Sequence, residues 1–213
     1  MASARRLGSW RSGPLLSSEP AFTQPPTERR YFHEVEQRWL INVPAENLYV
    51  TAEDVVLCTT LGSCVSACVH DPTAGLGALN HFLLPENPAG AALNEELRYG
   101  CHSMEQLLDE LIEMGARRET LQAKIFGGGC SGSLGAGVGS ANVAFVTKWL
   151  ASERVNVVAQ DVGGEWARQL RYYPVSGRAR VRRLLMSRRP GVVREECGVA
   201  GRLILPPAIE DEE

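Results

Sequence analysis

The chain of 213 residues has no apolar run long enough to cross a lipid bilayer. A membrane-spanning helix needs about 20 consecutive apolar residues, whereas the longest runs here, residues 55–57 and 155–159, have the length of strands. The apolar core of a secretory signal peptide is also missing. The six cysteines therefore indicate a reducing compartment in which thiols stay free. We expect a cytoplasmic protein that does not insert into membranes.

An excess of charge of either sign is missing as well. The 22 Lys and Arg residues stand against 25 Asp and Glu residues, which gives a net charge of −3. Arginines do cluster in residues 178–183, and such clusters can bind nucleic acid. Strand alternation places Arg178, Arg180 and Arg182 on one face, where contact with solvent is the ordinary explanation. We expect no nucleic-acid partner.

The sequence also lacks the paired CxxC motifs of a structural zinc site. Thiols and imidazoles do lie close together in one stretch, at Cys58, Cys64, Cys68, His70 and His81. Without a second pair of cysteines at ligand spacing, this stretch is a weak zinc signal. We expect no bound metal.

Residues 127–139 are rich in glycine and lie between an expected strand and an expected helix, as a phosphate-binding loop would. They contain no GxxxxGKS/T motif, and the GxGxxG spacing fails because Ser140 stands at the third glycine position. We interpret them as a surface loop and expect no cofactor.

The composition divides the chain into one domain and two tails. Residues 1–30 combine Arg, Ser, Pro and Gly without an apolar face, so burial cannot offset the entropy lost on ordering them. The absence of acids before Glu19 also admits a transit peptide. Residues 206–213 are prolines followed mainly by acids. We predict a single ordered domain over residues 31–205.

Hydrophobic periodicity within the domain predicts more strands than helices. One helix is expected to begin after a cap at Asn94 and to stop at Gly115, and a second to cover residues 141–152. Six or more strands with two helices predict an α+β fold and exclude a doubly wound parallel sheet. The predicted strands are residues 55–69 with a break at Gly62 and Ser63, 77–84, 122–126, 155–162, 166–173 and 178–185.

A turn at residues 70–75 relates a cysteine to a histidine. Cys64 and His81 are equidistant from the point between Pro72 and Thr73, so a hairpin without bulges would bring their Cβ atoms to about 5 Å. An imidazole at that distance could take the thiol proton and stabilise a nucleophilic thiolate. The sequence thus offers a candidate nucleophile and its base.

The turn before Cys64 could supply a further part of a hydrolytic site. Gly62 allows successive N–H groups, through Ser63, to converge on a developing oxyanion. The structural alternative is that Cys64 simply packs in a core, as free cysteines usually do, and that His81 is a satisfied core or edge residue. The pattern alone favours neither interpretation.

Motifs along residues 31–185 carry a family resemblance. They include TLGSCV at residues 60–65, GALNHFLLP at residues 77–85, AKIFGG at residues 123–128 and VAQDVGG at residues 158–164. With these motifs the chain resembles the CheD family, the chemoreceptor glutamine deamidases of bacterial and archaeal chemotaxis. The pairing of LGSC with NHFLLP at this separation is the specific part of the resemblance.

The resemblance implies roles for particular residues. It makes Cys64 the nucleophile and His81 its base. The third member in the family is a threonine six positions before the nucleophile, which falls here on Cys58, so the adjacent Thr59 is the candidate substitute. The resemblance also implies a β-sandwich with helices packed outside it, of an αββα-like kind.

The activity implied by the resemblance is conversion of specific chemoreceptor glutamines to glutamate through a thioester, with the oxyanion held by N–H groups near Gly62 and Ser63. The implied partners are methyl-accepting chemoreceptors as substrate and a CheC-type phosphatase. The alternative is a non-catalytic interaction module that binds the receptor or such a phosphatase.

Overall fold

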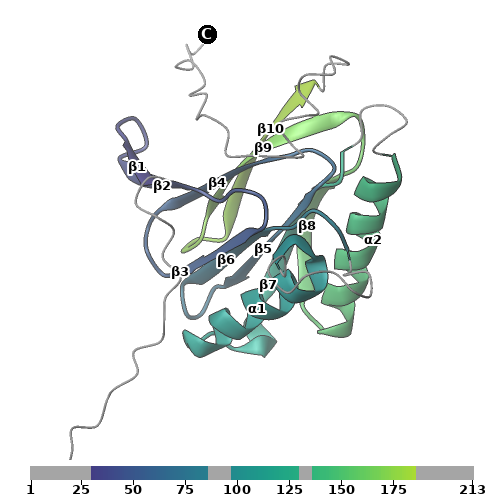
Figure 1. Ribbon diagram of the computed structural model, residues 1–213. Coiled ribbons are helices and arrows are strands. Elements are labelled where there is room, and N and C mark those ends of the chain that lie inside the picture. The colour runs from purple at the N-terminus through teal and green to yellow at the C-terminus, as the bar shows by residue number, and fades with distance from the viewer. Residues whose placement is uncertain (1–29, 86–96, 130–135, 186–213) are drawn as a thin grey trace, which may run out of the picture.

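Two five-stranded sheets pack face to face, and both helices cover the outer face of one of them (Figure 1). The computed structural model describes residues 30–85, 97–129 and 136–185. The predicted α+β class, with helices outside the sheets, is confirmed. None of the helices within these ranges is long and apolar enough to cross a membrane. Residues 1–29 of the predicted N-terminal tail, the predicted C-terminal tail and residues 86–96, 130–135 and 186–205 of the predicted domain lie outside the described residues. Arg30, the last residue of the predicted N-terminal tail, belongs to a strand, and the domain boundaries stay a prediction.

The first sheet has the strand order β1-β2-β4-β9-β10. Strands β2 and β4 run parallel, and the other neighbours are antiparallel. The predicted hairpin of β9 and β10 is confirmed, whereas β1 and β2 were not predicted. The strands are β1 (Arg30–His33), β2 (Arg38–Asn42), β4 (Val56–Leu61), β9 (Trp166–Tyr173) and β10 (Arg178–Leu185).

The second sheet has the order β3-β6-β5-β7-β8, in which only β7 and β8 are parallel neighbours. Its central strand β5 is buried on both faces. Val65, Ala67 and Val69 face the helices, while Cys68 faces the first sheet, as the period of two in a strand requires. The strands are β3 (Asn47–Thr51), β5 (Val65–Asp71), β6 (Leu76–His81), β7 (Gln122–Gly127) and β8 (Asn156–Val162).

Helix α1 (Gly100–Glu113) packs on β6 and β3, and helix α2 (Ala136–Ser152) packs on β7, β5 and β8. Helical spacing brings one face of α1 into the core, through Met104, Leu107, Leu108 and Leu111. The other core lies between the sheets. The site described below is at one edge of that core.

Both helix starts differ from the prediction. The structure begins α1 at Gly100, and the predicted cap at Asn94 lies outside the described residues. Helix α2 begins at Ala136 instead of residue 141, so the predicted glycine loop is shorter than expected. The reason is close packing, since a Cβ on Gly139 would lie 2.6 Å from the carbonyl oxygen of Gly128. Gly139, which indicated a loop in the sequence, lets the helix approach the backbone of Gly128, the residue after β7.

The turn between β5 and β6 is held by a buried carboxylate. Asp71 accepts hydrogen bonds from the backbone N–H groups of Thr73 and Arg117, both at 2.8 Å. Burial would raise the pKa of Asp71, but hydrogen bonds from Thr73 and Arg117 outweigh it and hold that pKa well below its usual value. The hairpin is thereby fixed to the segment that follows α1.

Candidate active site

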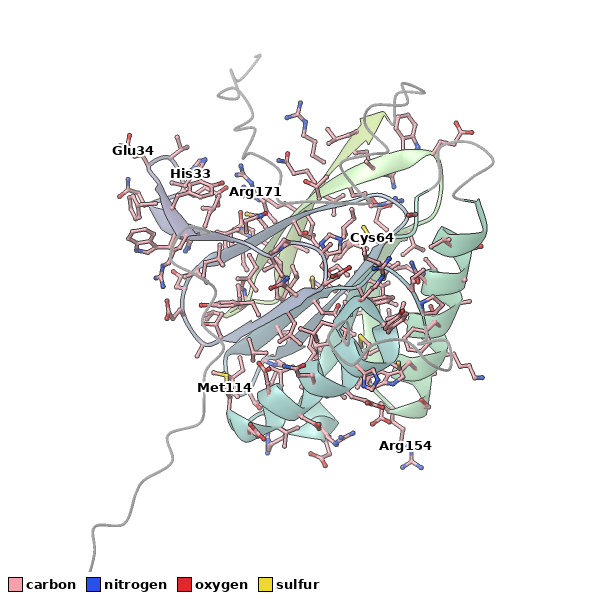
Figure 2. All side chains as sticks on the ribbon, viewed as in Figure 1. His33, Glu34, Cys64, Met114, Arg154 and Arg171 are labelled. Atoms are coloured by element: carbon pink, nitrogen blue, oxygen red, sulfur yellow. The ribbon has the colours of Figure 1, made fainter. Side chains whose placement is uncertain are left out.

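Cys64 and His81 meet at one end of the second sheet. Cys64 directly precedes β5, and His81 is the last residue of β6. The Cys64 Sγ atom lies 3.0 Å from Nε2 of His81. Both side chains are largely buried, with 7% and 5% of their surface exposed. Figure 2 shows Cys64 toward the interior of the molecule, far from the exposed Glu34 and Arg154.

The register of the hairpin differs from the prediction. Cys68 lies opposite Leu79, so continuing the pairing would place Leu83, not His81, opposite Cys64. The turn is centred one residue later than expected, which displaces the pairing by two residues. Because side chains alternate with a period of two, His81 stays on the same face as Cys64. The two side chains therefore meet diagonally instead of directly.

Thr59 reaches His81 from the other sheet. Its Oγ1 atom lies 2.8 Å from Nδ1 of His81, and the contact is buried. The approach needs no bulge, because β4 pairs with β9 without interruption from Leu57 to Leu61. Regular alternation already turns Thr59 inward, between two buried leucines.

Cys58 points away from His81. It packs with Tyr31, Leu40 and Val56 on the opposite face of the first sheet. Burial raises the pKa of Cys58 to about 12, and the positive charge of Arg171 only partly opposes this rise. The position six residues before the nucleophile is thus remote from the imidazole, and the position five residues before it contacts the ring.

The environment of His81 favours a neutral imidazole. Burial lowers the pKa of His81 to about 4, and a backbone hydrogen bond with Val43 partly opposes this decrease. A neutral ring has one nitrogen that donates and one that accepts. It can therefore accept a proton from Cys64 while its other nitrogen faces Thr59.

The backbone of the nucleophile turn, residues 61–64, is held by the segment after β7. Gly128 N–H donates to the carbonyl of Cys64 at 2.8 Å, and Gly129 N–H donates to the carbonyl of Gly62 at 2.7 Å. Gly127 has φ of +111°, and a Cβ there would lie 2.2 Å from the carbonyl oxygen of Cys64. These glycines allow two backbones to approach closely.

The N–H group of Gly62 faces the sulfur. Its nitrogen lies 3.4 Å from the Sγ atom of Cys64. Sulfur accepts such a bond more strongly as a thiolate, so this N–H would stabilise the anionic form of Cys64. The N–H of Gly62, predicted from the sequence as an oxyanion donor, points at the sulfur of the candidate nucleophile.

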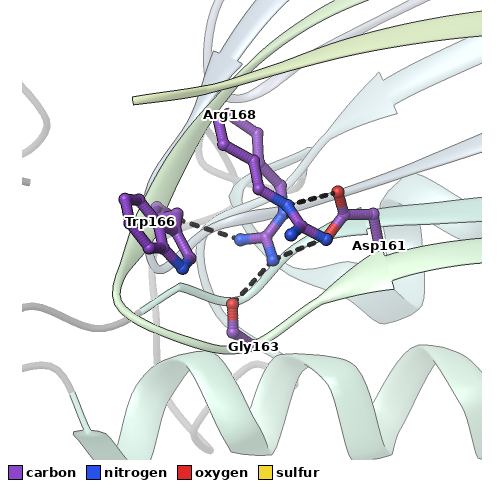
Figure 3. A network of polar contacts seen from close by, with 5 residues as sticks. Asp161, Gly163, Trp166 and Arg168 are labelled. Carbon is purple, nitrogen blue, oxygen red and sulfur yellow. Dashed lines mark hydrogen bonds and ion pairs between the residues drawn. The ribbon is translucent and has the colours of Figure 1, made fainter. Parts of the chain in front are cut away.

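A buried arginine, Arg168, holds a network of polar contacts with Asp161, Gly163 and Trp166 (Figure 3). The side chain of Arg168 is only 2% exposed and donates to Asp161 and to the carbonyl oxygens of Gly163 and Trp166. Gly129 packs against that same carbonyl of Trp166, where a Cβ would come within 2.3 Å. The network thus fixes the carbonyl group on which Gly129 packs, and Gly129 in turn holds the nucleophile turn.

Sequence reasoning missed Asp161, Arg168 and Asn142 as parts of the site. Asn142 comes from α2, and its Nδ2 atom donates to the carbonyl oxygens of Ser63 and Leu83. A signal existed for Asp161, because an acid followed by two glycines at the end of a strand marks a constrained turn. Nothing in the local sequence pairs Asn142 with residues about 60 or 80 positions earlier.

The stretch considered for zinc does not gather into a metal site. Burial raises the pKa of Cys68, with a hydrogen bond from Ser66 opposing it, so this thiol stays protonated. Across residues 30–85, 97–129 and 136–185, no three side chains of the His, Cys, Asp and Glu types are grouped as metal ligands.

A family model described as CheD chemotactic sensory transduction matches residues 83–183. A protein of Cupriavidus metallidurans named "Probable chemoreceptor glutamine deamidase CheD" is 44% identical over 195 residues, which covers 89% of each chain. That span includes residues 64–81, which precede the family-model match.

Two further proteins with the same name show similar relationships. The one from Cupriavidus pinatubonensis is 47% identical over 161 residues, covering 73% of this chain and 74% of its own. The one from Methylobacillus flagellatus is 44% identical over 160 residues, covering 73% and 79% respectively.

Proposed function

Because the chain belongs to the CheD family, we propose that it is a protein-glutamine deamidase that converts chemoreceptor glutamines to glutamate. The relatives are named for this activity, and the chain aligns with most of their length. The observation that carries the proposal is the line of contacts from Thr59 through His81 to Cys64. A nucleophile, a base and a group that orients the base are what such an acyl transfer needs.

The proposed reaction begins with transfer of the Cys64 thiol proton to Nε2 of His81. The thiolate attacks the side-chain carbonyl carbon of a glutamine and forms a tetrahedral adduct. The imidazolium then protonates the amide nitrogen, the C–N bond breaks, and ammonia leaves a thioester on Cys64. Water, with His81 as the base, cleaves the thioester, so glutamate is released and the thiol regains its proton.

Thr59 has an orienting role in this scheme. With Nδ1–H of His81 donating to its hydroxyl oxygen, Nε2 is the nitrogen left to accept the thiol proton. The hydroxyl also stabilises the imidazolium that forms during the reaction. Residues that fix the tautomer of a catalytic histidine in this way contribute less than the histidine itself.

The backbone N–H groups of residues 62–64 are the proposed donors to the oxyanion. Glycines 128 and 129 hold the carbonyls of this turn, which keeps its peptide planes fixed. Preorganised donors of this kind supply a large part of the stabilisation of a tetrahedral adduct. Gly62 first supports the thiolate and then lies beside the adduct that forms on the same sulfur.

The decisive experiment compares the protein with its Cys64→Ala variant on candidate receptors. Deamidation replaces an amide by an acid and adds about 1 Da, which peptide mass spectrometry detects. We expect the shift with the parent and none with the variant. An unchanged shift in the variant would refute Cys64 as the nucleophile, and no shift with the parent would favour the non-catalytic interaction module.

The contact of Thr59 with His81 supports catalysis over that alternative, because it supplies the orienting group that the departure at Cys58 would otherwise leave missing. A CheC-type phosphatase as partner and a cytoplasmic location stay predictions.

A further inference from the structure

The side chain of Asn142 joins the two segments that carry the reactive pair. It is fully buried on α2, and its Nδ2 atom donates to the carbonyl oxygen of Ser63 at 3.1 Å and to that of Leu83 at 2.8 Å. Ser63 immediately precedes Cys64, and Leu83 lies two residues after His81. One amide group therefore contacts the backbone next to both members of the pair.

The backbone ladder between the two segments ends just before these residues. Its last contact is the bridge of Val65 and Phe82, with N···O distances of 3.2 and 3.1 Å. Beyond it, the N–H of Leu83 donates to Arg98 instead of to the neighbouring segment. Within the part of the chain that the structure describes, the amide of Asn142 thus supplies the next link between the two segments, beyond the last backbone hydrogen bond of the ladder.

The orientation of this amide follows from its partners. Carbonyl oxygens only accept hydrogen bonds, so the NH₂ group must face both of them. The Oδ1 atom is then buried with no hydrogen-bond partner among the described residues. An unpaired buried acceptor is unfavourable, and a group retained at such a cost beside reacting residues is typical of a functional constraint.

We infer that Asn142 is a positioning residue that keeps the Cys64 sulfur aligned with Nε2 of His81, an inference that rests on the proposed deamidase function. It acts through the backbone of Ser63 and Leu83. Because a displacement of about 1 Å at reacting atoms can lower a rate about 100-fold, loss of both hydrogen bonds affects the chemical step more than substrate binding.

The test replaces Asn142 by Leu, which has a similar volume and no donor. We expect the rate of Cys64 alkylation by iodoacetamide at pH 7, and kcat for deamidation, to fall about 10- to 100-fold while KM changes less than about threefold. The matched control is Val146→Ala, one turn later on α2. Val146 is fully buried in the core between helices and sheet, so this variant loses stability without touching the nucleophile turn.

If Asn142 positions the reactive pair, Asn142→Leu lowers the rate of Cys64 alkylation more than Val146→Ala does. If its role is merely structural, the two variants lower that rate to a similar extent. If Asn142→Leu lowers the alkylation rate no more than Val146→Ala does, well below both melting temperatures, the inference is overturned. Should Asn142→Leu fail to fold, Asn142→Ala is measured against the same control with the same criterion. If the parent itself deamidates no receptor, the proposed function fails, while the alkylation comparison still decides the role of Asn142.

Discussion

Thr59 and His81 belong to different sheets, yet the hydroxyl oxygen of one lies 2.8 Å from Nδ1 of the other. The contact crosses the core between the sheets, and the imidazole continues it to Cys64. The proposed catalytic residues therefore depend on the packing of two layers as well as on one hairpin.

Removing the hydroxyl at this contact should lower activity without lowering affinity. Thr59→Val keeps the size of the side chain but leaves Nδ1 of His81 without its partner. We expect kcat to fall roughly 10-fold, the lower end of the effect of losing a group that orients a histidine, with KM unchanged. Thr59→Ser should restore most of the rate in the same steady-state assay.

Cys58 provides the control for that experiment. Its side chain packs on the opposite face of the first sheet, so Cys58→Thr should leave kcat/KM unchanged. A higher rate in Cys58→Thr would contradict the geometry and favour the six-residue offset of the family.

Replacing the imidazole itself should have a larger effect. His81→Gln removes the proposed base and acid, and we expect kcat to fall about 10²- to 10⁴-fold. His70→Gln is the matched control, because Nε2 of His70 lies 3.1 Å from the carbonyl oxygen of Val175, at the end of β5 remote from Cys64. Similar rates for both variants at neutral pH would exclude His81 as the base.

The buried imidazole should also make stability depend on pH. The pKa of His81 is about 4 in the folded protein against an ordinary value of 6.5, so the unfolded chain takes up a proton first as the pH falls. The free energy of unfolding should therefore be highest above about pH 6.5 and should decrease toward pH 4, by on the order of 3 kcal/mol from His81. Urea unfolding at pH 7 and pH 5 measures the part of this decrease that falls between those values, about 2 kcal/mol.

The variant His81→Gln serves as the reference for the pH experiment. It cannot titrate at this position, so its free energy of unfolding should change less between pH 7 and pH 5 than that of the parent. Asp71 and Asp161 have pKa values below their usual ones. Their contribution to the free energy of unfolding is therefore lost mainly below pH 5, outside this window. Equal pH dependence in both proteins would contradict a neutral buried His81.

The cysteines should react with iodoacetamide in an order that their solvent exposure alone would not predict. Cys64 is more buried than Cys101, but it contacts His81 and the N–H of Gly62. We expect iodoacetamide to modify Cys64 before Cys101, and Cys68 last, because burial raises the pKa of Cys68. Mass spectrometry after short exposures gives the order, and faster modification of Cys101 would count against an activated thiol.

Loss of the buried guanidinium should destabilise the protein. Among the described residues, Arg168→Met leaves the exposed Arg183 as the one ion-pair partner of Asp161, and it removes the donors to two carbonyl groups. Breaking a buried ion pair from one side typically costs about 3–5 kcal/mol. Denaturant unfolding should show a loss of this order, whereas Arg182→Ala, on an exposed side chain, should change stability by less than about 0.5 kcal/mol.

Local patterns in the sequence were enough to predict much of the second sheet and the β9–β10 hairpin. Alternation along β5 and the turn chemistry before β6 are signals within a few residues of each other. The register was wrong because the turn occupies residues 72–75, and no local signal fixes which of these residues belong to the strands. Cys64 and His81 still lie on the same face, because the pairing is displaced by two residues, an even number.

The contacts that sequence reasoning missed are those between distant segments. Asn142 approaches Ser63 from a helix 79 residues later. Thr59 was a candidate only through the family resemblance, because its contact with His81 crosses from one sheet to the other. The start of α2 was wrong because the local signal itself was misleading. Its glycines have low helix propensity, and the close approach of Gly139 to Gly128 overrides it.

The position of Thr59 on one sheet and His81 on the other makes the site sensitive to shear. Sliding the layers past each other by the width of one atom would separate the hydroxyl from the ring while leaving each sheet's own ladder intact. Catalytic competence would then disappear in a molecule that still has all its strands. Loss of activity would accordingly detect a displacement between the sheets that a measurement of secondary structure would not.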